Sequence, residues 1–358
     1  MTTKLRIAIG AAAGVAGLAL AAPALATFTP RLAISHNTAA TAGARPTTIH
    51  VTIPQSDDPV AQLNIFVPTG YTIAASTPGT QIGQASASVF SRDTGLTLPL
   101  EGPVTAADPA QFTGPPNNLC VPGQHFAVWL LALTVAGQNV TVPVYVDPTT
   151  GSPFSTLGAY KITTCFAPPD VPQGTPGRSP QGAQLLDANF TVNAAVTLPS
   201  ASGSYVWRML STPYTPGTGA PNVAGTVESR SFLGLPGTVT LSARYVVKTN
   251  TYRLTGRVSA GGTGVGGVRA QIFRGRTVAG LARVANTLTK ANGTYATAGH
   301  LRPKKTTYFQ VRVTVPEQDD ASGCTAANVP PAGNPAPPCV SSTLGGWAGR
   351  SAIVRIRL

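Results

Sequence analysis

The amino-acid sequence predicts an all-β protein, and three observations favour that fold class. Glycine and proline are abundant, at 38 and 33 of 358 residues, and both oppose long helices while supporting frequent turns. Many short segments alternate apolar and polar residues with the period of a half-buried strand. Apolar residues make up 42% of the chain, which is too many for a disordered protein. We therefore predict two antiparallel β-sandwich domains that follow an N-terminal signal peptide.

The first 26 residues have the pattern of a secretory signal peptide. Lys4 and Arg6 form a short positive region, and residues 7–20 form the apolar region that follows it. Residues 24–26, Ala-Leu-Ala, provide the small side chains of a cleavage site. The apolar region is long enough to cross a bilayer once, so a retained anchor is the alternative. No later stretch is apolar enough to cross, and we expect no transmembrane segment after cleavage.

The front domain is predicted at 46–248, after a linker at 27–45 that shows no period. Gly83 interrupts the alternation of its strand, so we expect a β-bulge there. Pro143 cannot donate to a ladder, so we expect a strand edge or a bulge at that point. The pattern fits one long sandwich or two small packed sheets. Strands are predicted at 47–53, 62–67, 80–90, 125–135, 139–146, 160–166, 184–198, 204–210 and 238–247, and 102–124 is predicted as loop.

Residues 251–358 are predicted to form a second, basic domain, in which 307–315 has the clearest strand pattern of the chain. Asn292-Gly293 is the pair that a type I′ hairpin turn favours, with positive φ at both positions. Residues 316–348 are rich in proline, and we predict an enlarged hairpin loop there. Strands are predicted at 252–258, 268–273, 307–315 and 351–358.

The order of these motifs resembles the carboxypeptidase regulatory-like and related bacterial Ig-like domains. In that family a G-x-P-V-x-G-A turn and a T-D-x-x-G-x-Y hairpin separate the strands. The matching residues are 264–268 and 289–295, although the usual proline is absent and Lys290 replaces the usual aspartate. The resemblance implies that 251–358 is an Ig-like accessory domain without catalytic residues. The segment 205–219 resembles uncharacterised secreted actinobacterial proteins, which implies no function.

The four cysteines of the chain are predicted to form two disulfides, as expected for an exported protein. Sequence order favours the pairs Cys120–Cys165 and Cys324–Cys339. Each would close a loop within its own domain and contribute about 2–4 kcal/mol. A metal site is the alternative, but no C-x-x-C spacing or neighbouring histidine supports it. We predict no metal and no cofactor.

The sequence contains no recognisable catalytic set. It has neither a G-x-S-x-G nucleophile elbow nor an H-E-x-x-H zinc motif, and its aspartates occur mostly in turn-like contexts beside proline. An enzyme would need a pocket that brings His50 or His125 together with a carboxylate. We therefore predict that the protein is not an enzyme.

Four aromatic or histidine side chains are candidates for ligand contacts. His125 and Trp129 are predicted on one face of a strand, either as a sugar-stacking platform or, as we favour, with the tryptophan in the core. Tyr214 and Trp347 lie among glycines and prolines, and we predict that they are the better candidates for exposed aromatic contacts.

Positive charge is concentrated in the second domain. Residues 251–358 carry 14 Lys+Arg and three Asp+Glu, whereas 27–250 carry nine of each. These cations either keep a surface poor in acids soluble or hold an anionic polymer. Nucleic acid is not expected, because export removes the protein from it and no aromatic residues interleave the cations. The candidate anion-binding residues are Arg253, Arg257, Arg274, Arg276, Arg302, Lys304, Lys305, Arg355 and Arg357.

The sequence thus predicts a secreted or surface-associated, non-catalytic β-sandwich protein with a structural or adhesive role. Its basic second domain would bind anionic cell-wall polymers, and its location would be extracellular, with association to the cell wall. The alternative is a carbohydrate- or ligand-binding module whose front domain carries the site.

Overall fold

The computed structural model describes residues 28–36, 41–118, 120–135, 138–301, 306–325 and 337–357. The protein is all-β, as predicted, and its described helical segments are short 3₁₀ turns. No helix in the described ranges is long and apolar enough to cross a membrane. The predicted signal peptide, 1–26, lies outside the described residues.

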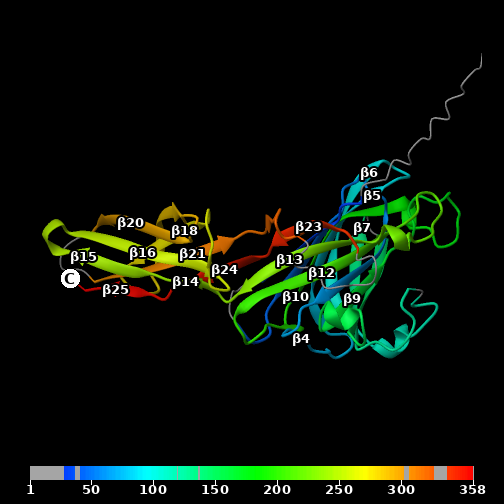
Figure 1. The fold of residues 1–358 in the computed structure, drawn as a ribbon, viewed down its shortest axis with the longest axis horizontal. Coiled ribbons are helices and arrows are strands. Elements are labelled where there is room, and N and C mark those ends of the chain that lie inside the picture. Colours follow the sequence, from blue (N-terminus) through cyan, green and yellow to red (C-terminus); the bar gives the residue numbers. More distant parts are fainter. Residues whose placement is uncertain are drawn as a thin grey trace, which may run out of the picture.

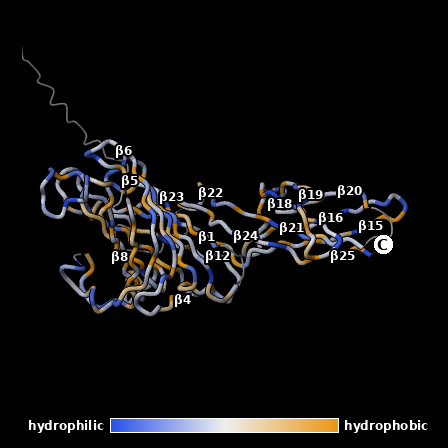
Figure 2. Tube along the Cα trace, turned by 180° about the vertical axis from the view of Figure 1, so that it is seen from behind, coloured by the Kyte–Doolittle hydropathy of each residue, from blue (hydrophilic) through white to orange (hydrophobic). Residues whose placement is uncertain are grey.

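The strands alternate between hydrophobic and hydrophilic residues (Figure 2) and fall into two parts of the chain. The first part contains β1 (Arg31–His36), β2 (Thr47–Thr52), β3 (Val60–Val67), β4 (Thr72–Ile73), β5 (Gln81–Ser91), β6 (Leu96–Ala107), β7 (Ala127–Val135), β8 (Gln138–Pro148), β9 (Tyr160–Cys165), β10 (Ala183–Val192), β11 (Val196–Thr197), β12 (Gly203–Pro213) and β13 (Val227–Leu235). The second part contains β14 (Gly237–Val239), β15 (Ser242–Val246), β16 (Thr251–Ala260), β17 (Thr263–Gly264), β18 (Arg269–Gly275), β19 (Ala282–Leu288), β20 (Thr294–His300), β21 (Thr307–Val315), β22 (Gln318–Asp319), β23 (Cys339–Leu344), β24 (Gly346–Arg350) and β25 (Val354–Ile356). The 3₁₀ turns are η1 (Pro109–Phe112), η2 (Phe154–Thr156), η3 (Pro180–Gly182), η4 (Val223–Gly225) and η5 (Val247–Thr249).

Apart from the short antiparallel pair β4–β11, the first part of the chain is one curled antiparallel sheet (Figure 1). Its strands pair in the order β1–β2–β10–β5–β6–β7–β8–β9–β3–β12–β13. The sheet curls because β13 returns to lie beside β1. Every second side chain therefore points into the enclosed space, where Leu32, Trp129 and Trp207 are fully buried in the first hydrophobic core.

β1 and β13 meet at a seam that side chains close. None of the strand pairings in the described ranges joins these two strands directly. Instead, Ser231 Oγ accepts the backbone N–H of Ile34 at 2.9 Å, and Ser229 Oγ donates to the carbonyl of Pro30 at 2.5 Å. Both serines are fully buried, so leaving either bond unmade would cost about 1–3 kcal/mol.

The second part packs two smaller sheets around its own core. One sheet places β16 between β15 and β20, with β14 and β17 also paired to β16. The other sheet runs β19–β18–β21, and both β24 and β25 pair with β21. Leu254 and Val258 of the first sheet share the second core with Ile272 and Phe309 of the other.

One turn in this part differs from its prediction. Gly293 has a φ of 79°, but Asn292 is not among the residues with positive φ, so the turn is not of type I′. The Asn292 side chain instead accepts the backbone N–H of Thr294 at 3.1 Å. Glycine is required at 293 for a second reason, because a Cβ there would lie 2.2 Å from the carbonyl oxygen of Val258.

The segment predicted as a loop at 316–348 is tied to the first part of the chain. Its described residues include β22, β23 and β24, and β23 runs parallel to β13 while β24 runs parallel to the end of β1. The sheet is therefore mixed rather than wholly antiparallel as predicted. β1 itself lies within the range 27–45 that the sequence predicts as a linker. That prediction is wrong at β1, because a strand buried on both faces has no alternation to reveal it.

Charged side chains reinforce this attachment. Arg31 Nη1 lies 2.9 Å from Glu317 Oε1, and Arg31 Nε lies 2.7 Å from Asp319 Oδ1. Arg230 is fully buried. It pairs with Glu228 at 2.8 Å and donates from Nη1 to the carbonyl of Gly323 at 3.0 Å. Arg208 pairs with the same carboxylate. Glu228 therefore supplies the negative charge for two buried arginines.

Both predicted disulfides are present. Cys120–Cys165 joins the loop before β7 to the end of β9, and Cys324–Cys339 joins the segment after β22 to the start of β23. Residues 326–336, which the second disulfide encloses, lie outside the described residues.

The predicted bulge at Gly83 is confirmed by a register shift between β5 and β6.

We expect His36 to make stability depend on pH. Burial lowers the pKa of His36 from 6.5 to about 4. Between pH 6.5 and pH 4 this histidine is therefore protonated in the unfolded chain but neutral in the folded protein. The free energy of unfolding should therefore fall as the pH falls from 6.5 to 4, by about 3 kcal/mol from this group. Urea unfolding between pH 7 and pH 4 measures this loss. His36→Gln should remove it and His300→Gln, at an exposed site, should not; identical pH dependence in both variants would contradict the assignment.

We expect Glu228→Gln to lower the free energy of unfolding by about 3 kcal/mol, because it leaves two buried arginines without their carboxylate. Glu101→Gln makes the same change at an exposed position and should stay within about 0.5 kcal/mol of wild type. Equilibrium denaturation of both variants makes the comparison. Equal effects would show that the buried carboxylate does not stabilise this region.

Candidate ligand-binding cavity

A cavity of about 860 Å³ lies inside the curled sheet of the first part. This volume falls within the range of roughly 300–1,000 Å³ that is typical of small-molecule sites. Its walls come from β2, β3, β5, β6, β7, β8, β9 and β10 and from the segments that follow β9 and precede β10. The aliphatic and aromatic residues that line it include Val51, Val60, Leu63, Ile65, Val89, Leu98, Leu100, Leu131, Leu133, Val140, Val142, Val144, Ile162, Phe166, Leu185 and Phe190.

Small side chains on two paired strands help to keep this space open. Ala87 of β5 lies directly across from Ala188 of β10, and both line the cavity. Ala85, two residues before Ala87 on the same face of β5, also lines the cavity. Larger apolar residues at these positions would fill the space that the opposing leucines and valines leave.

The cavity has no charged wall. None of the described residues that line it is Asp, Glu, Lys, Arg or His, and the lining cysteine, Cys165, is held in a disulfide. Burying an unpaired ion in such surroundings would be costly. The arrangement therefore favours an uncharged, apolar ligand and offers no acid, base or free thiolate for catalysis.

One buried polar atom at the cavity lacks a partner. Ser179 is 7% exposed, lines the cavity beside η3 and has an Oγ without a hydrogen-bond partner among the described residues. An unsatisfied buried hydroxyl costs about 1–3 kcal/mol. A polar group on an otherwise apolar ligand would remove that cost.

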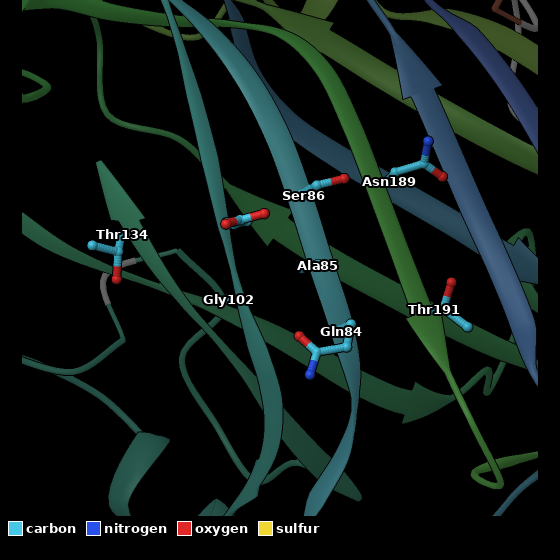
Figure 3. Close-up of a pocket in the computed structure, with 8 residues that line it drawn as sticks. Gln84, Ala85, Ser86, Gly102, Thr134, Asn189 and Thr191 are labelled. Carbon is cyan, nitrogen blue, oxygen red and sulfur yellow. The ribbon is translucent and has the colours of Figure 1, made fainter. Parts of the chain in front are cut away.

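A second hollow of about 720 Å³ lies next to this cavity, and the two share Ala85, Ser86 and Asn189. Figure 3 shows Gln84 and Ser86 on β5 with Asn189 and Thr191 on the neighbouring β10. The sheet is tightly bent here: a Cβ at Gly83 or Gly102 would lie 1.9 Å from a carbonyl oxygen of the next strand. None of the residues that line this polar groove is aromatic. A sugar would find hydrogen bonds there but no stacking surface.

The structure brings both His50 and His125 together with carboxylates, but not at the cavity or at the groove. His50 Nε2 lies 2.8 Å from Asp187 Oδ2 and its Nδ1 lies 3.1 Å from Glu317 Oε1. His125 Nδ1 lies 2.9 Å from Asp147 Oδ2. Neither histidine lines the cavity or the groove.

These two histidines connect segments of the chain. His50 links β10 to the segment after β21, and His125 also contacts the carbonyl of Val121 through Nε2 at 2.9 Å. Across the described residues, no group of three or more His, Cys, Asp or Glu side chains is arranged to hold a metal ion.

The predictions for aromatic residues had mixed outcomes. Trp129 is fully buried in the first core, which confirms the favoured interpretation, although β7 begins at Ala127 and so does not include His125. Tyr214 and Trp347 are 6% and 4% exposed, so the prediction that they are exposed is wrong. Tyr214 donates its hydroxyl to the carbonyl of Phe166 at 2.5 Å, and Trp347 packs in the second core.

The predicted anion-binding residues are spread over the second part. Arg253 and Arg257 are both exposed on β16. Arg253 lies near the start of β16, whereas Arg257 lies nearer its end and donates to the carbonyl of Asn292 at 3.2 Å. The others described are Arg274, Arg276, Arg355 and Arg357. They lie at the same end of the second part as the start of β16. Arg302, Lys304 and Lys305 lie outside the described residues. Anion binding by this set stays a prediction.

Comparison with models of known protein families finds no match to this chain, and comparison with curated proteins finds no relative. The resemblance of 251–358 to carboxypeptidase regulatory-like and Ig-like domains therefore stays a prediction. The functional proposal below depends on the geometry of the cavity.

Proposed function

We propose that the protein is an exported, non-catalytic β-sandwich protein whose first part binds an uncharged, apolar ligand inside its curled sheet. The observation that carries this proposal is the 860 Å³ cavity, whose described lining is mostly apolar and holds no charged side chain. Each Å² of apolar ligand surface removed from water contributes about 25 cal/mol. An elongated apolar molecule suits such a site better than a sugar, whose hydroxyl groups would lose their water.

Other features support parts of the proposal. Two disulfides agree with export, as does the signal peptide predicted at 1–26. We also propose that the chain comprises two sandwich domains, the second of them Ig-like, because each part has a separate hydrophobic core. A structural or adhesive role and the binding of cell-wall polymers stay predictions.

We expect Ala87→Phe to weaken ligand binding, because the larger side chain occupies the cavity. The probe is N-phenyl-1-naphthylamine, an uncharged dye whose fluorescence rises in apolar surroundings. Its dissociation constant should increase by about tenfold or more. Ser88→Phe makes a similar change at the next residue of β5, which does not line the cavity, and should bind the dye like wild type. Equal binding by the two variants would place the dye outside the cavity.

We expect Ser179 to favour a ligand that carries a hydroxyl group. Wild-type protein should release the dye to 1-dodecanol at a lower concentration than to dodecane. Ser179→Ala should reduce that preference by about fivefold, which corresponds to one hydrogen bond, while dodecane binds unchanged. Competition titrations of both proteins with both compounds measure the preference. A Ser179→Ala protein that keeps the full preference would remove Ser179 from the site.

A further inference from the structure

The end of the second part farthest from the curled sheet gathers several chain turns (Figure 1). Thr251, just after the β15–β16 turn, pairs with His300 at the end of β20. Arg274 Nη1, at the end of β18, lies 3.5 Å from the carbonyl oxygen of His300. Thr307, at the start of β21, pairs with Ile356 of β25. The β15–β16 turn, the β18–β19 turn and the end of β25 therefore lie together.

These turns expose large apolar side chains. Val246 and Val247 are 42% and 76% exposed, and Val278 in the β18–β19 turn is 51% exposed. Figure 2 shows hydrophobic and hydrophilic stretches next to one another at this end, near the labels β15 and C. A single exposed apolar residue needs no explanation, but several at adjoining turns mark an interaction surface.

Cations surround these valines. Lys248 follows Val247 directly, Arg276 lies two residues before Val278, and Arg355 and Arg357 are exposed near the end of β25. Residues 237–315 contain thirteen Lys and Arg and no Asp or Glu. Among the described residues, the recorded ion pairs include none of these four cations. Their charge is therefore available to an external anion.

We propose that this end, the valine–arginine tip, docks on the surface of an anionic lipid bilayer. The tip comprises Val246, Val247, Lys248, Arg276, Val278, Arg355 and Arg357. The valines enter the boundary between headgroups and acyl chains, and the cations bind the lipid phosphates. A linear polyanion explains the cations but leaves the valines in water, whereas a bilayer accepts both.

The shape of the tip agrees with this occupant. Both hollows described above lie in the first part of the chain, and the tip consists of adjoining turns. A projecting end can enter a flat bilayer, whereas a polymer chain is held best in a groove. The proposal goes beyond the ligand site, because it concerns other residues at the opposite end of the molecule.

The test is co-sedimentation of the full chain with vesicles of phosphatidylcholine alone or mixed with phosphatidylglycerol. Wild-type protein should bind the mixed vesicles at least about tenfold more tightly than the neutral ones, and salt should weaken that binding. Val247→Ser with Val278→Ser should weaken it by about tenfold, and so should Lys248→Glu with Arg276→Glu.

Matched controls separate the tip from general effects. Val223→Ser changes an exposed valine of the first part, and Lys290→Glu reverses an exposed charge between β19 and β20, at the opposite end of the second part. Both should bind vesicles like wild type. Ala87→Phe should also bind like wild type, so the tip and the cavity are tested independently.

Three outcomes would overturn the proposal. The first is equal affinity for neutral and anionic vesicles, and the second is no binding to either. The third is that the protein binds inorganic polyphosphate tightly and that the two valine substitutions change neither this binding nor the binding to vesicles. That last result would assign the cations to a linear polyanion.

Discussion

The closure of the curled sheet depends on the hydrogen bonds that join β1 to β13 across the seam. A curled sheet of this kind encloses space only if its two edges are held together, and exposed edges invite pairing with other chains. Ser231 and Ser229 supply these bonds from β13. Thr343 of β23 adds a third, donating to the carbonyl of Leu32 at 2.8 Å. These polar contacts close the sheet at its edges, and the cavity inside it is lined mostly by apolar side chains.

The second part of the chain also contributes to the closure. β23 and β24 extend the edges at β13 and β1, and Val340 of β23 packs against the first core. Glu317 holds both Arg31 and His50, while Arg230 reaches the carbonyl of Gly323. These contacts place the ion pairs where two distant stretches of sequence meet. The attachment leaves the valine–arginine tip at the far end of the molecule, away from the cavity.

The sequence predicts strands well where buried and more exposed residues alternate, as in 47–53 and the second half of 307–315. It misses β13, because Glu228 and Arg230 give this buried strand a polar sequence pattern. Both side chains are buried and pair with each other, which the sequence does not show. It misses β6, whose Pro99 and Pro103 are typical of loops, and β19, an edge strand with little burial. It does not predict the cavity, because leucines and valines around empty space alternate like those of a filled core. The available signal was the set of small residues at Ala85, Ala87 and Ala188.

A crystal structure of the protein grown with a brominated alkane would test the enclosed cavity most directly. Bromine has an anomalous signal that locates it without reference to the protein atoms. The account predicts bromine density inside the curled sheet, between Leu100, Leu133 and Phe190, with β1 and β13 still joined at the seam. Side chains that fill this space and exclude the alkane, or an open seam, would contradict it.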